Sequence, residues 1–475
     1  MSTYADVSGL VDGRRRRRHI LELADQSHGE ADPGDIVDDL ERLGFLRRHG
    51  GRLGWTGPES PDLLCRLVAL RDGPARSLVE VPADGACPVT IYAASEDEGA
   101  AAHLAGWGGA CGTGIGRRTA AVSCLYETAE RCAQVRHGDE ETHTAAFSDI
   151  ADGAIHPDRL LGVASDDQIP RSPTSSTPIM PLAPDLPISW TAGRHLISGK
   201  PFWLPTDFCY RSARCEGRAW TCPADSGGCS TGHSPEDVAV RGFLELVERD
   251  AVAIWWYNRV GRPGVSLEFT DLPPVQSIAA WQQERGRSFH LLDLTTDLGV
   301  PVVAAVSYAS DGCGIAVGFG ASFDPRIAVL RASLEMTQFL VMVELSLSLR
   351  VDDATHATRA AWSWFEGTSI ATEPYLMPRK DDAATKPAWA DDPPGDPEAA
   401  MSRCLAIAAR HGLDLLFIDM TRSWTGIPAG RVIVPGLLPT RLRAGARRLY
   451  DVPVKLGWIS SARHRDELNA KAMVF

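Results

Sequence analysis

"SCLYETAER", residues 123–131, places Ser123, Glu127 and Glu130 at offsets of four and seven, directly before Arg131. An α-helix has 3.6 residues per turn, so side chains at these offsets return to one face. The stretch therefore predicts a helix with a polar, glutamate-rich stripe. One such stripe is ordinary, because most surface helices carry a solvated polar face.

The same arrangement occurs twice more along the chain. Residues 234–259 begin with Ser-Pro, which is typical of a helix start, and they carry Glu245, Glu248 and Arg249. Residues 324–338 begin with Asp-Pro and predict a third helix. Its polar stripe, again at offsets of four and seven, consists of Arg331, Glu335 and Gln338.

Three such stripes facing one another would bring five carboxylates together. Two carboxylates about 5 Å apart repel each other by about 3 kcal/mol at an effective dielectric constant near 20. Divalent cations offset this repulsion, and Mg²⁺ is usually held by one or two carboxylates together with phosphate oxygens. Arginine binds phosphate directly. The pattern predicts a site for a magnesium nucleotide, and the simpler alternative is three amphipathic helices with solvated faces.

Composition narrows the classes of function. The chain has 475 residues, 44% of them hydrophobic and 23% charged, which suits a globular protein of two or three domains. A net charge of −13 argues against general nucleic-acid binding. The sequence has no apolar run long enough for a membrane helix and no secretory signal core at its N-terminus, so we expect a cytoplasmic protein without membrane contact.

The eleven cysteines are scattered, which fits reduced thiols better than a disulfide framework. Four of them form a loose cluster without a CxxC motif, and separate thiols are a simpler interpretation than a structural zinc site. This cluster consists of Cys209, Cys215, Cys222 and Cys229.

The chain divides into a small and a large part. Residues 16–48 predict two helices, and "GGRLGWTG" at 50–57 predicts a hairpin, so we expect a winged-helix-like module over residues 1–62. Residues 63–475 alternate between strand-like and helical segments, which predicts a mixed α+β fold. The predicted strands lie at 88–94, twice within 290–308, and at 314–322, 413–421 and 430–436.

Two further segments have open interpretations. The five arginines at 14–18 form either a solvated patch or a docking site for an acidic partner. "GTGIGRR" at 112–118 is neither of the common glycine-rich nucleotide motifs. It is either a plain turn or a loop whose backbone N–H groups bind phosphate before the first glutamate helix.

The three glutamate motifs, in this order, resemble the nucleotide-binding motifs of the YcaO family, ATP-dependent enzymes that modify peptide backbones. The segments "DLTTDLGVPVVAAV", "GRVIVPGL" and "DVPVKLGW" are also similar, and the resemblance covers about residues 85–475. It implies a YcaO-like α+β fold with a glutamate-lined cleft for ATP and Mg²⁺. The implied Mg²⁺ ligands, which also belong to the ATP site, are Glu127, Glu130, Glu245, Glu248 and Glu335. The implied ATP contacts are Ser123, Arg131, Arg249, Arg331 and Gln338.

The resemblance also implies an activity. In the azoline-forming group, ATP phosphorylates a backbone amide oxygen, a Cys, Ser or Thr side chain attacks the amide carbon, and phosphate leaves. The alternatives are thioamide or amidine formation, and a non-catalytic peptide-binding scaffold. The implied partners are a precursor peptide, a leader-peptide-binding protein, a downstream dehydrogenase and a second copy of the chain. Residues 1–62 are a possible leader-binding module.

The sequence departs from the family pattern at three places. Thr113 replaces the usual lysine before the first motif, and Arg117 or Arg118 is expected to supply the lost charge. Gly227 stands where the family has an asparagine. The final "ELNAKAMVF" lacks the prolines of the PxPxP tail that reaches the active site in the azoline-forming group, and the resemblance makes the carboxylate of Phe475 a candidate catalytic group.

Overall fold

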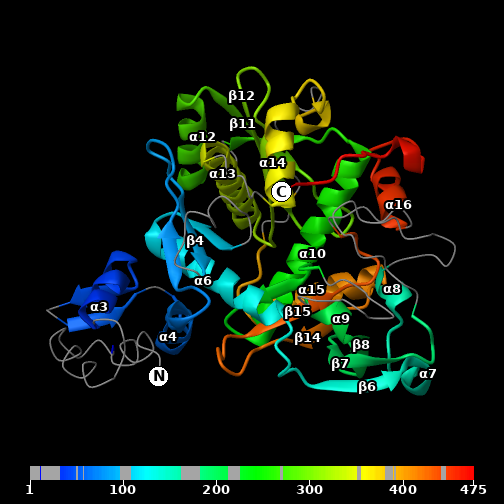
Figure 1. The fold of residues 1–475 in the computed structure, drawn as a ribbon. Coiled ribbons are helices and arrows are strands. Elements are labelled where there is room, and N and C mark those ends of the chain that lie inside the picture. Colours follow the sequence, from blue (N-terminus) through cyan, green and yellow to red (C-terminus); the bar gives the residue numbers. More distant parts are fainter. Residues whose placement is uncertain are drawn as a thin grey trace.

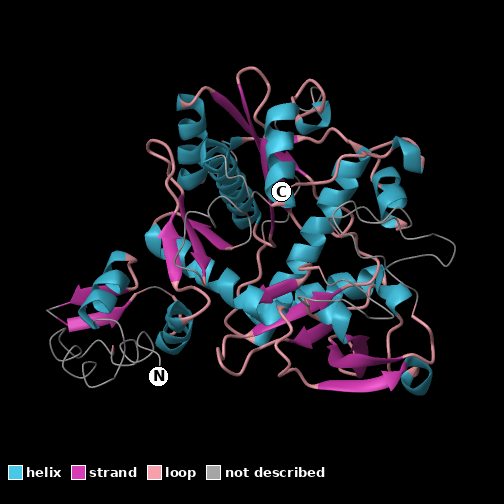
Figure 2. Cartoon of the chain, viewed as in Figure 1, coloured by secondary structure: helices cyan, strands magenta, loops and turns pink. Residues whose placement is uncertain are grey.

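The computed structural model describes residues 11, 33–49, 52–56, 58–96, 109–161, 182–211, 225–267, 271–349, 355–379, 389, 392–439 and 446–474. Helices and strands are mixed along the chain, and the helices lie between and around separate small sheets (Figures 1 and 2). The α+β prediction is confirmed.

A helix and a hairpin form the first described part of the chain. They are α3 (Pro33–Arg42) and the antiparallel strands β1 (Leu46–His49) and β2 (Arg52–Trp55), as the hairpin motif predicted. Their core continues into α4 (Pro61–Ala69), η1 (Leu70–Asp72) and α6 (Arg117–Gln134). The first predicted helix and the arginines 14–18 lie outside the described residues, so the module boundary at residue 62 stays a prediction.

Two sheets have a glutamate helix packed against an edge strand. The first has the order β3 (Ser77–Glu80), β4 (Thr90–Ser95), β5 (Ala110–Gly114), and α6 packs on it. The second has the order β10 (Gly264–Val265), β11 (Arg287–Asp293), β12 (Val302–Ala309), β13 (Ala316–Ala321). It is covered by α12 (Pro273–Glu284) and α13 (Pro325–Leu349). Both sheets are antiparallel.

The third sheet is also antiparallel, and it carries the helix α10 (Pro235–Asn258). Its order is β6 (Thr142–Ala146), β7 (Pro187–His195), β14 (Leu416–Asp419), β15 (Ala429–Ile433), β9 (Cys229–Thr231), and β8 (Pro201–Pro205) also pairs with β7. The remaining elements are α7 (Phe147–Ile150), α8 (Pro157–Leu161), α9 (Thr206–Cys209), α14 (His356–Gly367), η2 (Pro374–Leu376), α15 (Pro397–His411), α16 (Arg448–Lys455) and η3 (Arg465–Glu467). The predicted strands at 88–94, 290–308, 314–322, 413–421 and 430–436 correspond to β4, β11 with β12, β13, β14 and β15.

Glycines allow two of the glutamate helices to touch their strands. A Cβ atom at Gly112 of β5 would lie 2.0 Å from the backbone nitrogen of Cys124, and one at Gly318 of β13 would lie 2.0 Å from that of Met336. Backbones this close leave no room for a side chain. The interpretation of residues 112–118 as a glycine-rich loop is therefore wrong for its first part, since Thr113 lies in β5 and pairs with Ile91.

Candidate functional site

The helix α6 presents the first motif. It begins after Gly116, whose φ of 92° requires a glycine. Ser123, Glu127 and Glu130 follow on one face, and each is partly accessible to solvent. Arg131 Nε donates to Glu127 Oε1 at 2.8 Å, so the arginine of the motif pairs with a glutamate of its own helix.

The helix α10 presents the second motif, and its start is built as predicted. Ser234 Oγ accepts a hydrogen bond from the backbone N–H of Asp237 at 3.2 Å. Further along, Arg249 Nε donates to Glu245 Oε1 at 2.9 Å, and the backbone N–H of Gly228 donates to Glu245 Oε2 at 3.0 Å. The turn before β9 therefore reaches the motif directly.

The helix α13 presents the third motif. The backbone N–H of Phe319 in β13 donates to Glu335 Oε2 at 2.5 Å. Arg331 Nη1 lies 3.5 Å from the carbonyl oxygen of Ala321. Both side chains are accessible to solvent. The strand under α13 thus orients the motif, as the close contact at Gly318 allows.

The electrostatics bring the motifs of the three helices together. Burial raises the pKa of Glu130 well above its usual range, and Glu127 and Glu245 raise it further. Burial raises the pKa of Glu248 to about 8, and Glu335 adds to the shift. Charges on α6 therefore act on α10, and charges on α10 act on α13. Figure 1 shows the three helices toward the middle of the molecule.

The glutamates of the three helices act on one another, and water still reaches their side chains. Burial is the first cause of the raised pKa of Glu335, although its side chain is exposed to solvent. We use the name glutamate recess for this group of charged side chains, which act on one another across the three helices. Its members are Glu127, Glu130, Arg131, Glu245, Glu248, Arg249, Arg331 and Glu335. Ser123 and Gln338 share the helices α6 and α13 with them, and both are half-buried.

The residues of the recess fit Mg²⁺ that is shared with phosphate. No three His, Cys, Asp or Glu side chains within the described residues lie close enough to hold a metal ion together. Mg²⁺ does not require such a cage, because it usually takes one or two carboxylates and completes its shell with waters and phosphate oxygens. Burial and the neighbouring glutamates raise the pKa values of Glu130 and Glu248, so ionising either carboxylate is unfavourable unless a cation offsets the cost.

Arg117 and Arg118 do not replace the missing lysine. Arg117 Nε donates to Glu80 Oε2 at 3.0 Å. Arg118 donates to Thr56 Oγ1 at 3.0 Å and forms an ion pair with Glu59. Both guanidinium groups therefore bind α6 to neighbouring segments, and the expectation that they supply the loop charge is wrong.

Other predicted residues have mixed outcomes. Gly227 lies in the turn whose next residue contacts Glu245, and its backbone N–H donates to Asp225 Oδ1 at 3.1 Å. Cys209 and Cys229 are buried free thiols, and Cys215 and Cys222 lie outside the described residues. Phe475 also lies outside them.

The segment before Phe475 is bound to α10. The backbone N–H of Asn469 donates to the carbonyl oxygen of Tyr257, and Trp256 Nε1 donates to that of Lys471, both at 2.8 Å. The backbone donors at Gly228 and Phe319 were not expected as part of the site. The sequence signal that could have indicated these donors is the glycine-containing strand or turn that precedes each glutamate helix.

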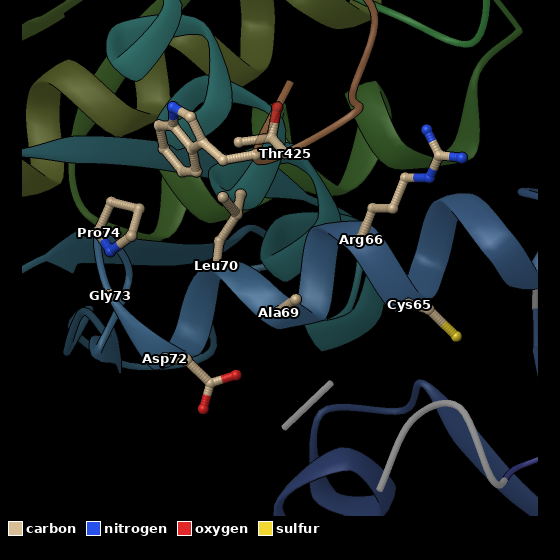
Figure 3. A pocket seen from close by; sticks show the side chains of 9 residues that line it. Cys65, Arg66, Ala69, Leu70, Asp72, Gly73, Pro74 and Thr425 are labelled. Carbon is tan, nitrogen blue, oxygen red and sulfur yellow. The ribbon is translucent and has the colours of Figure 1, made fainter. Parts of the chain in front are cut away.

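A separate pocket lies away from the recess. It has a volume of about 430 Å³, and Figure 3 shows it between α4, η1 and the β14–β15 connection. Leu70, Pro74 and the half-exposed Trp424 give it an apolar lining. It contains none of the predicted site residues.

The mixed fold, with glutamates and arginines grouped on three helices, fits the class of enzymes that use a nucleotide and a divalent cation. Residues 111–438 match the profile of a family described as YcaO cyclodehydratase, ATP- and Mg²⁺-binding. The chain belongs to the YcaO family, which confirms the resemblance, the enzyme class of ATP-dependent cyclodehydratase, and ATP and Mg²⁺ as cofactors.

Relatives and solved structures agree with this assignment. An uncharacterized protein of Methanothermobacter thermautotrophicus is 26% identical over 69% of this chain and 80% of its own length. A heterocyclase solved with substrate and cofactor is 30% identical with a TM-score of 0.74, over 87% of this chain and 56% of that one. The heterocyclase TruD is 33% identical with a TM-score of 0.63, over 75% of this chain and 50% of that one. The chain thus spans about half the length of these heterocyclases.

The described residues contain no helix that combines the length and the apolar character needed to cross a bilayer.

Proposed function

We propose that this chain converts Cys, or Ser and Thr, residues of a ribosomally made precursor peptide to azolines, using ATP and Mg²⁺. The observation that supports the proposal is that glutamates from α6, α10 and α13 act electrostatically on one another while water still reaches their side chains. The heterocyclase likeness supports the peptide substrate.

The overall reaction balances as a dehydration. The side-chain thiol or hydroxyl adds to the carbon of the preceding amide, and the amide oxygen leaves as inorganic phosphate. The peptide loses one water equivalent per ring, and ATP becomes ADP. ATP supplies the phosphoryl group that turns a poor leaving group into a good one, so the residues of the recess mainly position charge.

The proposed roles follow from charge and position. Glu127, Glu130, Glu245, Glu248 and Glu335 supply oxygen ligands for Mg²⁺. The phosphates and the nucleotide are contacted by Ser123, Arg131, Arg249, Arg331 and Gln338. Arg131 and Arg249 each form an ion pair with a glutamate four residues earlier, so both guanidinium groups lie beside proposed Mg²⁺ ligands, where phosphate oxygens would also be held. Phe475 remains a proposed catalytic group.

The N-terminal hairpin is the proposed leader-binding surface. The strand β1 exposes Arg47 and His49, and Arg52 of β2 is exposed beside them, whereas Arg48 is ion-paired with Glu41. An extended acidic peptide could pair with the edge of such a hairpin and meet its positive charge. A separate leader-binding protein, a downstream dehydrogenase and homodimer formation in the cytoplasm belong to the same proposal.

The test is the intact mass of a Cys-containing precursor peptide after co-expression with this chain and a leader-binding partner. Loss of one water mass per modified residue supports azoline formation, and we expect Glu248→Gln to abolish it. Glu236→Gln is the matched control, because it removes an exposed carboxylate about 18 Å away on the same helix.

Other mass changes distinguish the alternatives. Replacement of oxygen by sulfur indicates a thioamide, and condensation with an amine indicates an amidine. An unchanged peptide, together with failure of the chain to bind Mg²⁺ and an ATP analogue, contradicts the enzyme proposal and leaves a scaffold.

A further inference from the structure

A buried carboxylate lies behind the glutamate recess. Asp250 directly follows Arg249 on α10, and its side chain is completely buried. It accepts hydrogen bonds from Arg448 Nε at 2.9 Å and from Arg448 Nη2 at 2.7 Å. The backbone N–H of Leu438 adds a third at 3.0 Å. Burial of a charge is costly unless it is well paired, so this arrangement is specific.

Arg448 joins Asp250 to a second carboxylate. Its Nη2 donates to Asp297 Oδ1 at 2.8 Å, in the connection between β11 and β12. Two further cationic or titratable groups face Asp297: His411 Nδ1 at 3.7 Å and Lys455 Nζ at 3.5 Å. The cluster therefore binds α10 to α15, to α16 and to the β11–β12 connection.

The position of Asp250 on the helix relates the cluster to the recess. Successive residues of an α-helix are about 100° apart, so Asp250 lies about 200° around the axis from Glu248. The cluster thus holds the side of α10 that points away from the recess. The Asp250 carboxylate is held by three donors from two other segments, and these contacts oppose a rotation of α10 about its axis.

A small rotation of α10 would matter for the chemistry. Side-chain ends lie about 5–6 Å from the helix axis, so a rotation of about 10° moves them by about 1 Å. A misplacement of about 1 Å caused by a distant residue can reduce a rate about 100-fold. The Asp250 contacts therefore matter for the placement of Glu248 and Arg249 as well as for stability.

We infer that Arg448 is a positioning residue for the glutamate recess: by bridging Asp250 and Asp297 it sets the rotation of α10 and the places of Glu248 and Arg249. This inference rests on the proposed function. Arg448 lies beyond residue 438, where the match to the family profile ends. In this inference, the C-terminal segment of the chain contacts α10 on the side opposite Glu248 and thereby positions the residues of the second motif.

The test must separate positioning from stability. Arg448→Met alone leaves the Asp250 carboxylate buried and unpaired, so it is expected to destabilise the fold. The double variant Asp250→Asn with Arg448→Met removes both charges of the buried pair and so avoids that penalty at Asp250, while Asp297 keeps Lys455 as an ion-pair partner. For each variant we would measure the thermal unfolding midpoint, the affinity for a non-hydrolysable ATP analogue with Mg²⁺ by calorimetry, and kcat and KM with the precursor peptide.

We expect the double variant to unfold within a few degrees of the wild type. Its affinity for the analogue, or its kcat, should fall by about 10- to 100-fold. Arg448→Lys keeps the charge but loses the planar two-point contact, and an intermediate loss is expected. The matched control is Glu344→Gln with Arg285→Met, which removes another Arg–carboxylate pair, with contacts of 2.8 and 2.9 Å, at the far end of α13. It should keep the wild-type affinity and kcat.

The outcomes are distinct. A double variant that folds normally, binds the analogue and turns over like the wild type overturns the positioning role while leaving the proposed function intact. If the wild type itself fails to bind the analogue, the proposed function is contradicted and the inference falls with it. A loss confined to the Asp250–Arg448 double variant supports the inference.

Discussion

At the residue scale, Glu248 is the clearest sign of a site that is not optimised for stability. Burial and the charge of Glu335 raise its pKa to about 8, so ionisation of this carboxylate is unfavourable in the folded chain. Removing the negative charge should therefore stabilise the protein and stop the proposed reaction. Opposite effects on stability and activity are typical of functional residues.

The pH dependence of unfolding tests whether loss of the Glu248 charge stabilises the protein. Because the pKa of Glu248 is higher in the folded state than in the unfolded state, its contribution is favourable below the unfolded pKa of about 4.5 and is lost as pH rises toward 8. In metal-free protein, Glu248→Gln should raise the free energy of unfolding at pH 7 by about 1–3 kcal/mol, since one pKa unit corresponds to about 1.4 kcal/mol. The gain should vanish near pH 4. Urea titrations at pH 7 and near pH 4 measure this gain in the free energy of unfolding, with Glu236→Gln as the control. An equal gain at the two pH values contradicts the electrostatic cause.

At the element scale, the placement of each glutamate helix depends on its contact with the strand or turn before it. Gly318 is the sharpest case, because a Cβ atom there would meet the backbone of α13 at Met336 and Glu335. Gly318→Ala should push α13 away from β13 and destabilise the fold by about 3 kcal/mol, the upper part of the usual range for overpacking. It should also weaken nucleotide binding, because Phe319 and Glu335 would separate.

Gly261→Ala is the comparison for this prediction. The Cβ atom that it adds meets nothing within 4 Å, so the free energy of unfolding should change by less than about 0.5 kcal/mol. Chemical denaturation of both variants gives the two values. Similar values for both would mean that α13 can shift without cost, and that the close contact at Gly318 does not hold Glu335.

The sequence predicted the elements well where local signals were strong. Ser234 and Pro235 marked the start of α10, and alternating apolar residues marked the central strands. The helix α13 is longer than predicted, reaching Leu349 instead of 338. In its second half Phe339, Leu340 and Val343 are buried. The polar stripe from which the helix was predicted ends at Gln338, so the pattern gave no sign of the remaining turns. Residues 112–114 were misassigned because glycines that permit close packing look like a loop.

At the scale of the whole molecule, the sequence predicted which side chains lie on the polar faces of three helices, but it could not predict what holds those helices in place. Spacing along one helix reveals a common face, and the three stripes were recognisable for that reason. The pairing of Asp250 with Arg448 joins residues 198 positions apart. Local periodicity carries no information about such a contact, and the same applies to Arg118 and Glu59.

The recess connects parts of the molecule that otherwise have separate cores. The helix α6 belongs largely to one hydrophobic cluster, and α10 and α13 belong to another. A ligand that contacts all three helices should therefore stabilise the whole chain. At a ligand concentration 100 times the dissociation constant, the stabilisation is about 2.7 kcal/mol. With an unfolding entropy of about 2 cal/mol/K per residue, this corresponds to a rise of about 3 °C in the unfolding midpoint.

This rise should require both components of the ligand. An ATP analogue without Mg²⁺ brings its phosphates close to the glutamates with no cation between them, so it should raise the midpoint less than the analogue with Mg²⁺. Glu335→Gln removes a proposed Mg²⁺ ligand and should reduce the effect of the complex. Differential scanning calorimetry with EDTA, with Mg²⁺ alone, with the analogue alone and with both tests this. An equal rise with and without Mg²⁺ would mean that the glutamates do not bind the cation, and that the nucleotide binds through the arginines.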